Sequence, residues 1–291
     1  MPTSTVSASP RSFGDFRKRV GTFGRYKNPM YLDAIHLPES ALTEHYPFTV
    51  EAIAGLEDLK FETPVTFLVG ENGCGKSSLI EAIACGMRCA AAGAADLTRD
   101  PMLAHARELA KAMRFARGKT TRTRLFFRAE DAIGFTHRIS NEMAYLKALE
   151  DEYDKTLKGE GRQRAMGNAR RERQELSRRY GDDPDARSHG EWFLNMLSER
   201  IHGEGLYILD EPETPLSPVH QLTLLSIILE CVKTGGQFII ATHSPIVMAC
   251  PQARIYSLDS VPIQPIAWED VEHVAITRAF LADPEAYLRH L

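Results

Sequence analysis

Residues 67–79, FLVGENGCGKSSL, decide the fold of this chain. The segment places three glycines and a lysine within seven residues, directly after one apolar run and directly before another. Gly70, four further residues and then Gly75, Lys76 and Ser77 fit G-x-x-x-x-G-K-[ST], the pattern of a loop that binds phosphate groups. Glycines let such a loop turn its N–H groups inward, where they form a nest for anionic oxygens. The segment therefore predicts a site for the phosphates of a nucleotide.

The residues on either side of this loop support the same interpretation. PVTFLV (64–69) is a short β-prone run, and SSLIEAIACGM (77–87) has apolar residues at helical spacing. The N-terminus of that helix adds a positive dipole end, Lys76 can reach the outer phosphates, and the Ser77 hydroxyl is expected on Mg²⁺. The residues predicted to contact the nucleotide are Asn72, Gly73, Cys74, Gly75, Lys76, Ser77 and Ser78. The alternative is a chance glycine-rich turn before a helix.

Length and composition are compatible with one large α/β domain, or with one domain and a subdomain, because 291 residues can bury a full core. The formal net charge of −4 gives no global basic field that would attract nucleic acid. A hydrophobic content of 43% is ordinary for a soluble protein. No apolar run approaches the roughly 18 residues that a membrane helix needs, so we expect no membrane partner.

The first residues, MPTSTVSASPRSFG, are rich in Ser, Thr and Pro and lack the apolar core of a secretory signal. Residues 1–29 are therefore expected to be a flexible tail. The five cysteines include no repeated C-x-x-C pair, so neither a disulfide framework nor a zinc site is indicated. A reducing, cytoplasmic setting is expected.

Strands and helices are predicted to alternate along much of the chain. MYLDAIHL (30–37) alternates apolar and polar residues like a half-buried strand, and residues 45–61 are expected to continue as short strands. Further on, we expect strands in GLYILDEPE (205–213) and QFIIATHSP (237–245), a helix over 217–235 between them, and a last strand in ARIYSLD (253–259). Such alternation builds a parallel sheet with helices on its faces.

The middle of the chain, residues 96–187, is predicted to be an inserted helical and charged subdomain. Residues 96–124 look helical and basic, a strand follows in LFFRAE (125–130), and residues 141–187 indicate an exposed helical pair or a mobile insertion. The arginines of this last segment are Arg162, Arg164, Arg170, Arg171, Arg173, Arg178 and Arg179. They could hold a nucleic-acid backbone, or they could pair locally with Glu172 and Glu175, and the sequence leaves both options open.

Two acidic residues end the predicted strand LYILDEPE. A carboxylate at the carboxyl end of a buried strand beside a phosphate loop can hold Mg²⁺, which predicts a metal-binding role for Asp210. Glu211 follows directly, where it could orient and deprotonate a water that attacks the γ-phosphate. The alternative is a strand that ends in two solvated acids.

A histidine ends the predicted strand FIIATHSP. His243 could donate a hydrogen bond to the γ-phosphate or to the attacking water, and so sense whether that phosphate is present. A structural histidine after a strand is the alternative. The predicted catalytic residues are thus Glu211, His243 and Lys76.

Together, GENGCGKSS, LDEPE followed by TPLSP, and ATHSP resemble the ATP-binding-cassette (ABC) class of P-loop ATPases. The closest likeness is to its soluble SMC-like and RecF-like branch, often labelled "AAA family ATPase". The resemblance runs from about Tyr31 to the ending EDVEHVAITRAFLADPEAYLRHL. It implies an α/β fold over residues 30–291: a P-loop NTPase with an ABC-type ATPase head, a mainly parallel core sheet, an N-terminal β portion and a helical subdomain. It also implies ATP and Mg²⁺ as cofactors.

The same resemblance implies a homodimer. In this class two heads associate head to tail, and each ATP lies between the phosphate loop of one head and a signature loop of the other. The usual LSGGQ signature is absent, and SHGE (188–191) lies where it is expected. Ser188 and the Gly190 backbone could contact the opposite γ-phosphate at a helix N-terminus. An ordinary helix cap with a turn glycine is the alternative.

Three further positions match the class less well. A glutamine that couples Mg²⁺ to the helical subdomain has no obvious counterpart, and Glu130 is the candidate by position. Ser217 lies where the loop after the catalytic glutamate usually carries an aspartate. The aromatic residue that stacks on adenine could be Tyr46 or Phe48, although either could belong to the core.

The implied function is an ATPase that dimerises on ATP, hydrolyses it and opens again. SMC-like relatives mostly act on DNA in repair, chromosome maintenance or phage defence, often with a nuclease, so DNA or an effector protein such as a nuclease is the expected partner. The alternative is a nucleotide-dependent switch that controls an effector and turns over slowly. The missing LSGGQ and coupling glutamine disfavour a transporter motor, and a small-molecule kinase has no need for Asp210, Glu211 and His243 together.

Overall fold

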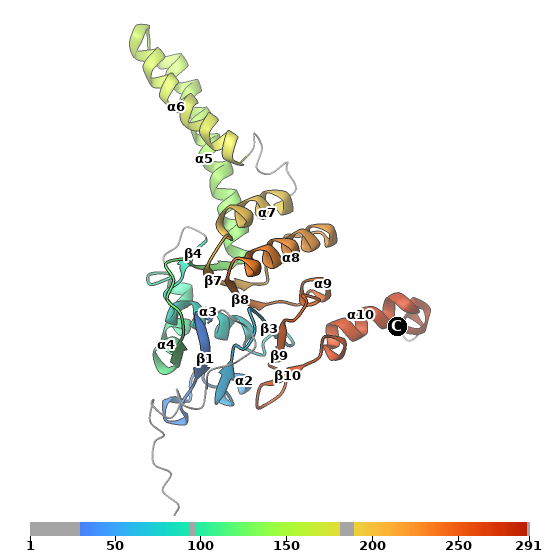
Figure 1. The fold of residues 1–291 in the computed structure, drawn as a ribbon. Coiled ribbons are helices and arrows are strands. Elements are labelled where there is room, and N and C mark those ends of the chain that lie inside the picture. Colours follow the sequence, from blue (N-terminus) through green and yellow to red (C-terminus); the bar gives the residue numbers. More distant parts are fainter. Residues whose placement is uncertain (1–29, 93–96, 181–188, 290–291) are drawn as a thin grey trace, which may run out of the picture.

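A computed structural model describes residues 30–92, 97–180 and 189–289. The tail predicted for residues 1–29 lies outside this part of the chain. The described residues form an α/β fold with one large and one small sheet (Figure 1). The predicted fold class, with a mainly parallel core sheet, is confirmed.

The large sheet has seven strands in the described chain. In spatial order they are β10 (Gln264–Ile266), β9 (Arg254–Ser257), β3 (Val65–Val69), β8 (Gly236–Ala241), β7 (Gly205–Asp210), β6 (Arg124–Arg128) and β4 (Ala90–Ala91). All neighbouring strands are parallel except β10, which runs antiparallel to β9. The central strands β3, β7 and β8 are buried at every residue, as expected for parallel strands covered on both faces.

The small sheet is antiparallel, in the order β2 (Asp58–Lys60), β1 (Leu32–His36) and β5 (Arg114–Arg117). A buried amide side chain joins it to the large sheet. Gln237 on β8 accepts hydrogen bonds from the backbone N–H groups of Tyr31 (2.8 Å) and Leu32 (3.0 Å) and donates one to the Leu32 carbonyl (2.8 Å). Because both the oxygen and the nitrogen of this amide are hydrogen-bonded, its burial leaves no unsatisfied polar group. The three hydrogen bonds fix the position of β1 relative to β8.

Helices cover both faces of the large sheet. On the first face lie α2 (Glu51–Ala54), α3 (Lys76–Gly86) and α4 (Ala104–Ala112), whereas α5 (Ala129–Thr156) and α6 (Gly159–Tyr180) extend away from the sheet (Figure 1). On the second face lie α7 (His189–Arg200), α8 (Pro218–Lys233), α9 (Pro245–Met248) and the start of α10 (Glu272–Ala282), and the exposed helix α11 (Pro284–Leu288) follows α10. Short 3₁₀ turns are η1 (Glu39–Ala41), η2 (Pro101–Leu103) and η3 (Trp268–Asp270).

Alternate residues of the central strands enter two hydrophobic cores. Ile208 and Ile239 pack with α3, α4 and the small sheet, whereas Tyr207 and Phe238 face the opposite side and pack with α7 and α8. The Tyr207 and Phe238 rings stack at 5.0 Å between centroids. This alternation follows from the two-residue period of a strand, and it holds the phosphate-loop helix α3 firmly against the sheet.

The expected helical pair is confirmed, since α5 and α6 form an antiparallel hairpin that projects from the body (Figure 1). Some of the arginines of this hairpin form ion pairs with acidic side chains of the same hairpin. Arg162 pairs with Asp154, Arg164 pairs with Glu160 at 3.4 Å, and Arg173 pairs with Glu150 at 2.8 Å. Local pairing therefore accounts for three of the arginines that the sequence singled out.

Three expectations for local structure were wrong. Residues 51–54 form a helical turn, not a strand. Arg114–Arg117, expected as part of a basic helix, is strand β5, because pairing with β1 decides its conformation. The strand at 254–257 is not the last, since β10 follows it. The predicted insertion at 96–187 thus contains strands of both sheets, and its helical hairpin occupies residues 129–180.

Among the described residues, no helix combines the length and the apolar character needed to cross a bilayer.

Candidate functional site

The carboxyl ends of the parallel strands gather most of the predicted site residues at one edge of the large sheet. The phosphate loop (70–77) follows β3, Asp210 ends β7 and Glu211 follows it, and His243 follows β8. Because β3, β8 and β7 are neighbours in the sheet, these three segments lie side by side. This is the edge at which open α/β sheets bind ligands.

Backbone geometry explains two of the loop glycines. Gly75 is the N-cap of α3 and has φ 102°, a left-handed conformation that glycine adopts without strain. Gly70 has φ 149°, and a Cβ there would lie 2.7 Å from Cys74 Sγ and 2.8 Å from Asp259 Oδ1. Any side chain at Gly70 would therefore disturb the loop.

Lys76 is buried, and its ammonium group lies inside the phosphate loop. It donates to the carbonyls of Gly70 (2.8 Å) and Glu71 (2.7 Å), and Cys74 Sγ lies 3.8 Å away. A phosphate oxygen would give this ammonium a charged acceptor, which makes a stronger hydrogen bond than a neutral carbonyl does. The Lys76 ammonium is thus placed where it could donate a charge-assisted hydrogen bond to a phosphate bound in the loop.

Asp259 supports the phosphate loop, and sequence reasoning missed this residue. Its Oδ1 accepts a 2.8 Å hydrogen bond from the Glu71 backbone N–H. Asp259 follows β9, the other neighbour of β3, so only the sheet order brings it to the loop. The contact joins residues 188 positions apart, and no local pattern could have revealed it.

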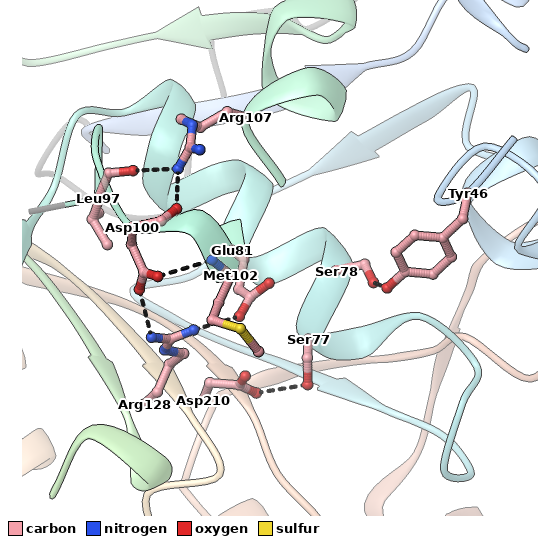
Figure 2. Close-up of polar contacts among 10 residues, drawn as sticks. All are labelled: Tyr46, Ser77, Ser78, Glu81, Leu97, Asp100, Met102, Arg107, Arg128 and Asp210. Atoms are coloured by element: carbon pink, nitrogen blue, oxygen red, sulfur yellow. Dashed lines mark hydrogen bonds and ion pairs between the residues drawn. The ribbon is translucent and has the colours of Figure 1, made fainter. Parts of the chain in front are cut away.

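Asp210 is buried, and its Oδ1 accepts a 3.4 Å hydrogen bond from Ser77 Oγ (Figure 2). Burial is the main cause that raises the pKa of this carboxyl to about 7, and the nearby charges of Glu81 and Glu211 raise it further. Ser77 opposes the shift by its hydrogen bond. The ionised form of this carboxyl is therefore unfavourable without a cation nearby, and a bound cation would stabilise it.

The residues at this point suit Mg²⁺. The Ser77 hydroxyl and the Asp210 carboxylate are hard oxygen ligands, and the surrounding charge of Glu81, Glu211 and Glu130 is negative. Within the described ranges, no group of three or more His, Cys, Asp or Glu side chains is arranged to hold a metal. Mg²⁺ bound with a nucleotide commonly uses one or two protein ligands together with phosphate oxygens and water.

Glu211 has an unusual backbone conformation. Its φ of 48° lies in the left-handed region, which costs a non-glycine residue about 1 kcal/mol or more. Its N–H donates to the Ala241 carbonyl at 2.9 Å, a contact that ties the end of β7 to the end of β8. The side chain is 40% exposed, and Oε1 lies 3.6 Å from His243 Nε2. Glu211 is thus accessible to water while its backbone is held in a strained turn.

His243 is surrounded by acids and by a second histidine. Its backbone N–H donates to Glu213 Oε1 (2.7 Å), and its Nδ1 lies 3.3 Å from His273 Nε2. Burial is the main cause that lowers the pKa of His243, and the nearby Lys76 and His273 lower it further, which favours the neutral imidazole. Neither Glu213 nor His273 was expected from sequence.

Arg128, which sequence reasoning also missed, occupies the end of β6. Its guanidinium pairs with Glu81 of α3 (3.2 Å) and with Asp100 (3.1 Å), as Figure 2 shows. In the sheet, Arg128 lies opposite Asp210 of the neighbouring strand β7. Glu130, the predicted counterpart of the coupling glutamine, is exposed on the first turn of α5 and acts on Asp210 through its charge. Arg128 is therefore the residue that ties the base of the hairpin to the phosphate-loop helix.

The two candidate adenine-stacking aromatics lie in different environments. Phe48 is buried in the first core, so its side chain is a packing residue. Tyr46 is 49% exposed, and its hydroxyl lies 2.6 Å from Ser78 Oγ at the start of α3 (Figure 2). Of the two side chains, only that of Tyr46 is accessible, and its stacking on a base stays a prediction.

The signature-loop candidate is partly described. Ser188 lies outside the described residues. Gly190 is buried, and a Cβ there would come within 2.9 Å of both the Pro215 carbonyl and His220 Nδ1, which is a packing reason for glycine. Ser217 is the N-cap of α8 and accepts a hydrogen bond from the His220 N–H. Contact of Gly190 with a second head stays a prediction.

Alkylation of Cys74 offers a direct test of phosphate-loop occupancy. Cys74 and Cys85 are half-buried whereas the other cysteines are buried. Burial raises the pKa of both thiols, that of Cys85 to about 11, but at Cys74 the charge of Lys76 opposes the rise. We expect N-ethylmaleimide to modify Cys74 first. ATP with Mg²⁺ at about 10 times its Kd should slow this reaction about tenfold, because only empty sites react. Intact-protein mass spectrometry would follow it, with Cys74→Ser and Cys85→Ser as controls. Equal rates with and without nucleotide would contradict the assignment.

Residues 50–178 match the family model described as "AAA domain", which confirms the predicted resemblance to an ABC-class, SMC-like P-loop ATPase. No curated protein matches the sequence.

Solved structures with a similar chain include a metal-chelate type ABC transporter in an inward-facing conformation, at 14% identity and TM-score 0.42, covering 87% of this chain and 90% of that one. The SMC head domain from Thermotoga maritima is 15% identical, with TM-score 0.35 and coverage of 82% and 100%. The SMC head domain from Pyrococcus furiosus, bound to the C-terminal domain of ScpA, is 12% identical, with TM-score 0.36 and coverage of 86% and 100%.

Proposed function

We propose that this chain binds ATP with Mg²⁺, closes as a head-to-tail dimer around two nucleotides, and hydrolyses them. One observation carries the proposal: the phosphate loop, the Asp210–Glu211 pair and His243 meet at the carboxyl edge of three adjacent parallel strands. Each of these parts has a separate role in phosphoryl transfer. A site that only bound phosphate would need the loop and would not need the two acids or the histidine.

In the proposed mechanism, Lys76 and the loop N–H groups bind the phosphates, and Ser77 and Asp210 hold the metal ion. Bound Mg²⁺ would neutralise charge on the phosphate oxygens. Glu211, accessible and strained, orients and deprotonates the attacking water. His243 would donate toward the γ-phosphate side, and the accessible ring of Tyr46, which is hydrogen-bonded to Ser78, would stack on the base. Ser188 and Gly190 would complete the site of the opposite head.

The partner is proposed to be DNA or an effector protein, with a cytoplasmic location. The ion pairs within the α5–α6 hairpin leave less free positive charge for DNA than the arginine count alone indicates. DNA therefore enters the experiment as a separate arm. Slow turnover without a DNA response would favour the alternative, a nucleotide-dependent switch on an effector.

Phosphate release and sedimentation velocity would test the proposal on the full chain. We expect the wild type to hydrolyse ATP only with Mg²⁺ and to sediment partly as a dimer with ATP. Lys76→Ala should abolish both, whereas the matched surface variant Lys233→Ala should abolish neither, since Lys233 is exposed on α8. A wild type that binds no ATP would overturn the proposal, and each reaction should be repeated with and without double-stranded DNA.

A further inference from the structure

His243 has two neutral tautomers, and they present opposite chemistry to the site. With its proton on Nε2 the ring offers a donor toward Glu211, and with its proton on Nδ1 it offers a lone pair there. The protein must select the first form if His243 is to donate to a phosphate oxygen. The question is which residue makes the selection.

The surroundings of Nε2 favour the donor form. The nearest acidic atom is Glu211 Oε1 at 3.6 Å, and an ionised carboxylate is an acceptor only. A lone pair on Nε2 would face that carboxylate and be repelled. Nε2 is also buried and has no hydrogen-bond partner among the described residues. A proton at this position therefore leaves an unused, buried N–H that faces the catalytic glutamate.

The surroundings of Nδ1 show what holds that form in place. His273 Nε2 lies 3.3 Å from His243 Nδ1, and the rings are 4.7 Å apart between centroids. One of these two nitrogens must donate. If His273 donates, His243 Nδ1 is the acceptor and its proton must be on Nε2. The hydrogen bond and the repulsion from Glu211 thus select the same tautomer.

We propose that His273 is a positioning residue, which donates to His243 Nδ1 and thereby fixes the proton of His243 on Nε2, facing Glu211 and the γ-phosphate side. His273 does not touch the nucleotide, and it acts only through His243. Its role in turnover rests on the proposed ATPase function, whereas the tautomer itself can be observed without nucleotide.

The fold holds His273 firmly enough for this task. His273 is on the first turn of α10, and the neighbouring Val271 and Val274 are both buried in the second core. Trp268 Nε1, just before this helix, donates to the Pro245 carbonyl at 3.0 Å, two residues beyond His243. The base of α10 is thus anchored to the segment that carries His243. The other charged groups near His243 are Glu211, Glu213, Lys76 and Asp259.

Two substitutions separate the hydrogen bond from packing. His273→Phe keeps an aromatic ring but removes the donor, and kcat for ATP should fall about tenfold to a hundredfold, the range found when a metal-binding histidine loses the hydrogen-bond partner that orients it. KM for ATP should stay unchanged. His273→Gln keeps an N–H donor and should restore most of the turnover. Thr277→Ala, one turn further along the exposed side of α10, is the matched control and should behave as wild type.

Nitrogen-15 NMR of histidine-labelled, nucleotide-free protein observes the tautomer directly, with His243→Gln used to assign the signals. We expect a protonated Nε2 and an unprotonated Nδ1 in the wild type and in His273→Gln, and a mixture in His273→Phe. A wild-type spectrum with the proton on Nδ1 would overturn the proposal, and so would unchanged turnover in His273→Phe. If the wild type hydrolyses no ATP, the ATPase proposal fails, and the spectrum still decides the role of His273.

Discussion

Replacing Glu211 with glutamine is expected to lower ATP turnover about a hundredfold to ten-thousandfold, the usual contribution of a positioned general base. ATP binding should persist, because the phosphate loop and Asp210 are untouched. Glutamine has nearly the same shape as glutamate but cannot accept the proton of the attacking water. Single-turnover hydrolysis and equilibrium nucleotide binding, measured side by side, would check both halves of this result.

The same variant should also change the oligomeric state. If ATP holds two heads together and hydrolysis releases them, a protein that binds but does not cleave ATP accumulates as a dimer. Sedimentation velocity with ATP and Mg²⁺ should show this dimer for Glu211→Gln and a smaller share for the wild type. Glu230→Gln, at an exposed position of α8, is the matched control. Wild-type turnover and a monomeric state in Glu211→Gln would rule out Glu211 as the base.

Replacing Asp210 with asparagine is expected to stabilise the metal-free protein while abolishing Mg²⁺-dependent hydrolysis. Burial and neighbouring acids raise the pKa of Asp210 to about 7 in the folded state, whereas an unfolded aspartate titrates near 3.9. The folded chain therefore binds the proton more tightly, and this group makes stability fall as pH rises from about 4 to 7. Asparagine carries no charge, so at pH 8 it should raise the free energy of unfolding by about 2 to 4 kcal/mol.

Urea unfolding in EDTA at two pH values would check the sign of this effect. At pH 5 Asp210 is already protonated in the folded protein, so Asp210→Asn and the wild type should differ far less than at pH 8. Asp151→Asn, at an exposed position of α5, should have little effect at either pH. An asparagine variant that is less stable at pH 8 would show that the carboxylate is not the destabilised group we infer. Added Mg²⁺ and ATP should stabilise only the wild type.

Sequence alone predicted the parts of the site that depend on short patterns. The loop from Gly70 to Ser77 and the acids after β7 follow apolar runs that can be recognised locally, and the structure has strands there. Residues that act across the fold were not predicted. Asp259 reaches the loop only because β9 lies beside β3, and Arg128 meets Glu81 only because β6 and α3 pack together.

Local charge also led to a wrong expectation. Arg114 and Arg117 made residues 96–124 resemble a basic helix, yet these residues pair with His36 and Leu32 in an antiparallel strand. Strand propensity depends on a partner strand that is distant in sequence, so a single segment cannot reveal it. His273 shows the same limit at the site, because nothing near it in sequence relates it to His243.

The strand order has a consequence for how the protein is made. Strand β3, which precedes the phosphate loop, lies between β8 and β9, and its Val65 and Thr66 pair with Phe238 and Arg254. The ribosome synthesises VTFLV long before either neighbouring strand, so this strand, which is buried at every residue in the folded protein, stays unpaired while most of the chain is synthesised. Pairing between such distant segments is slow. The strand that leads into the phosphate loop is thus one that cannot complete its pairing until residues 236–257 have been synthesised.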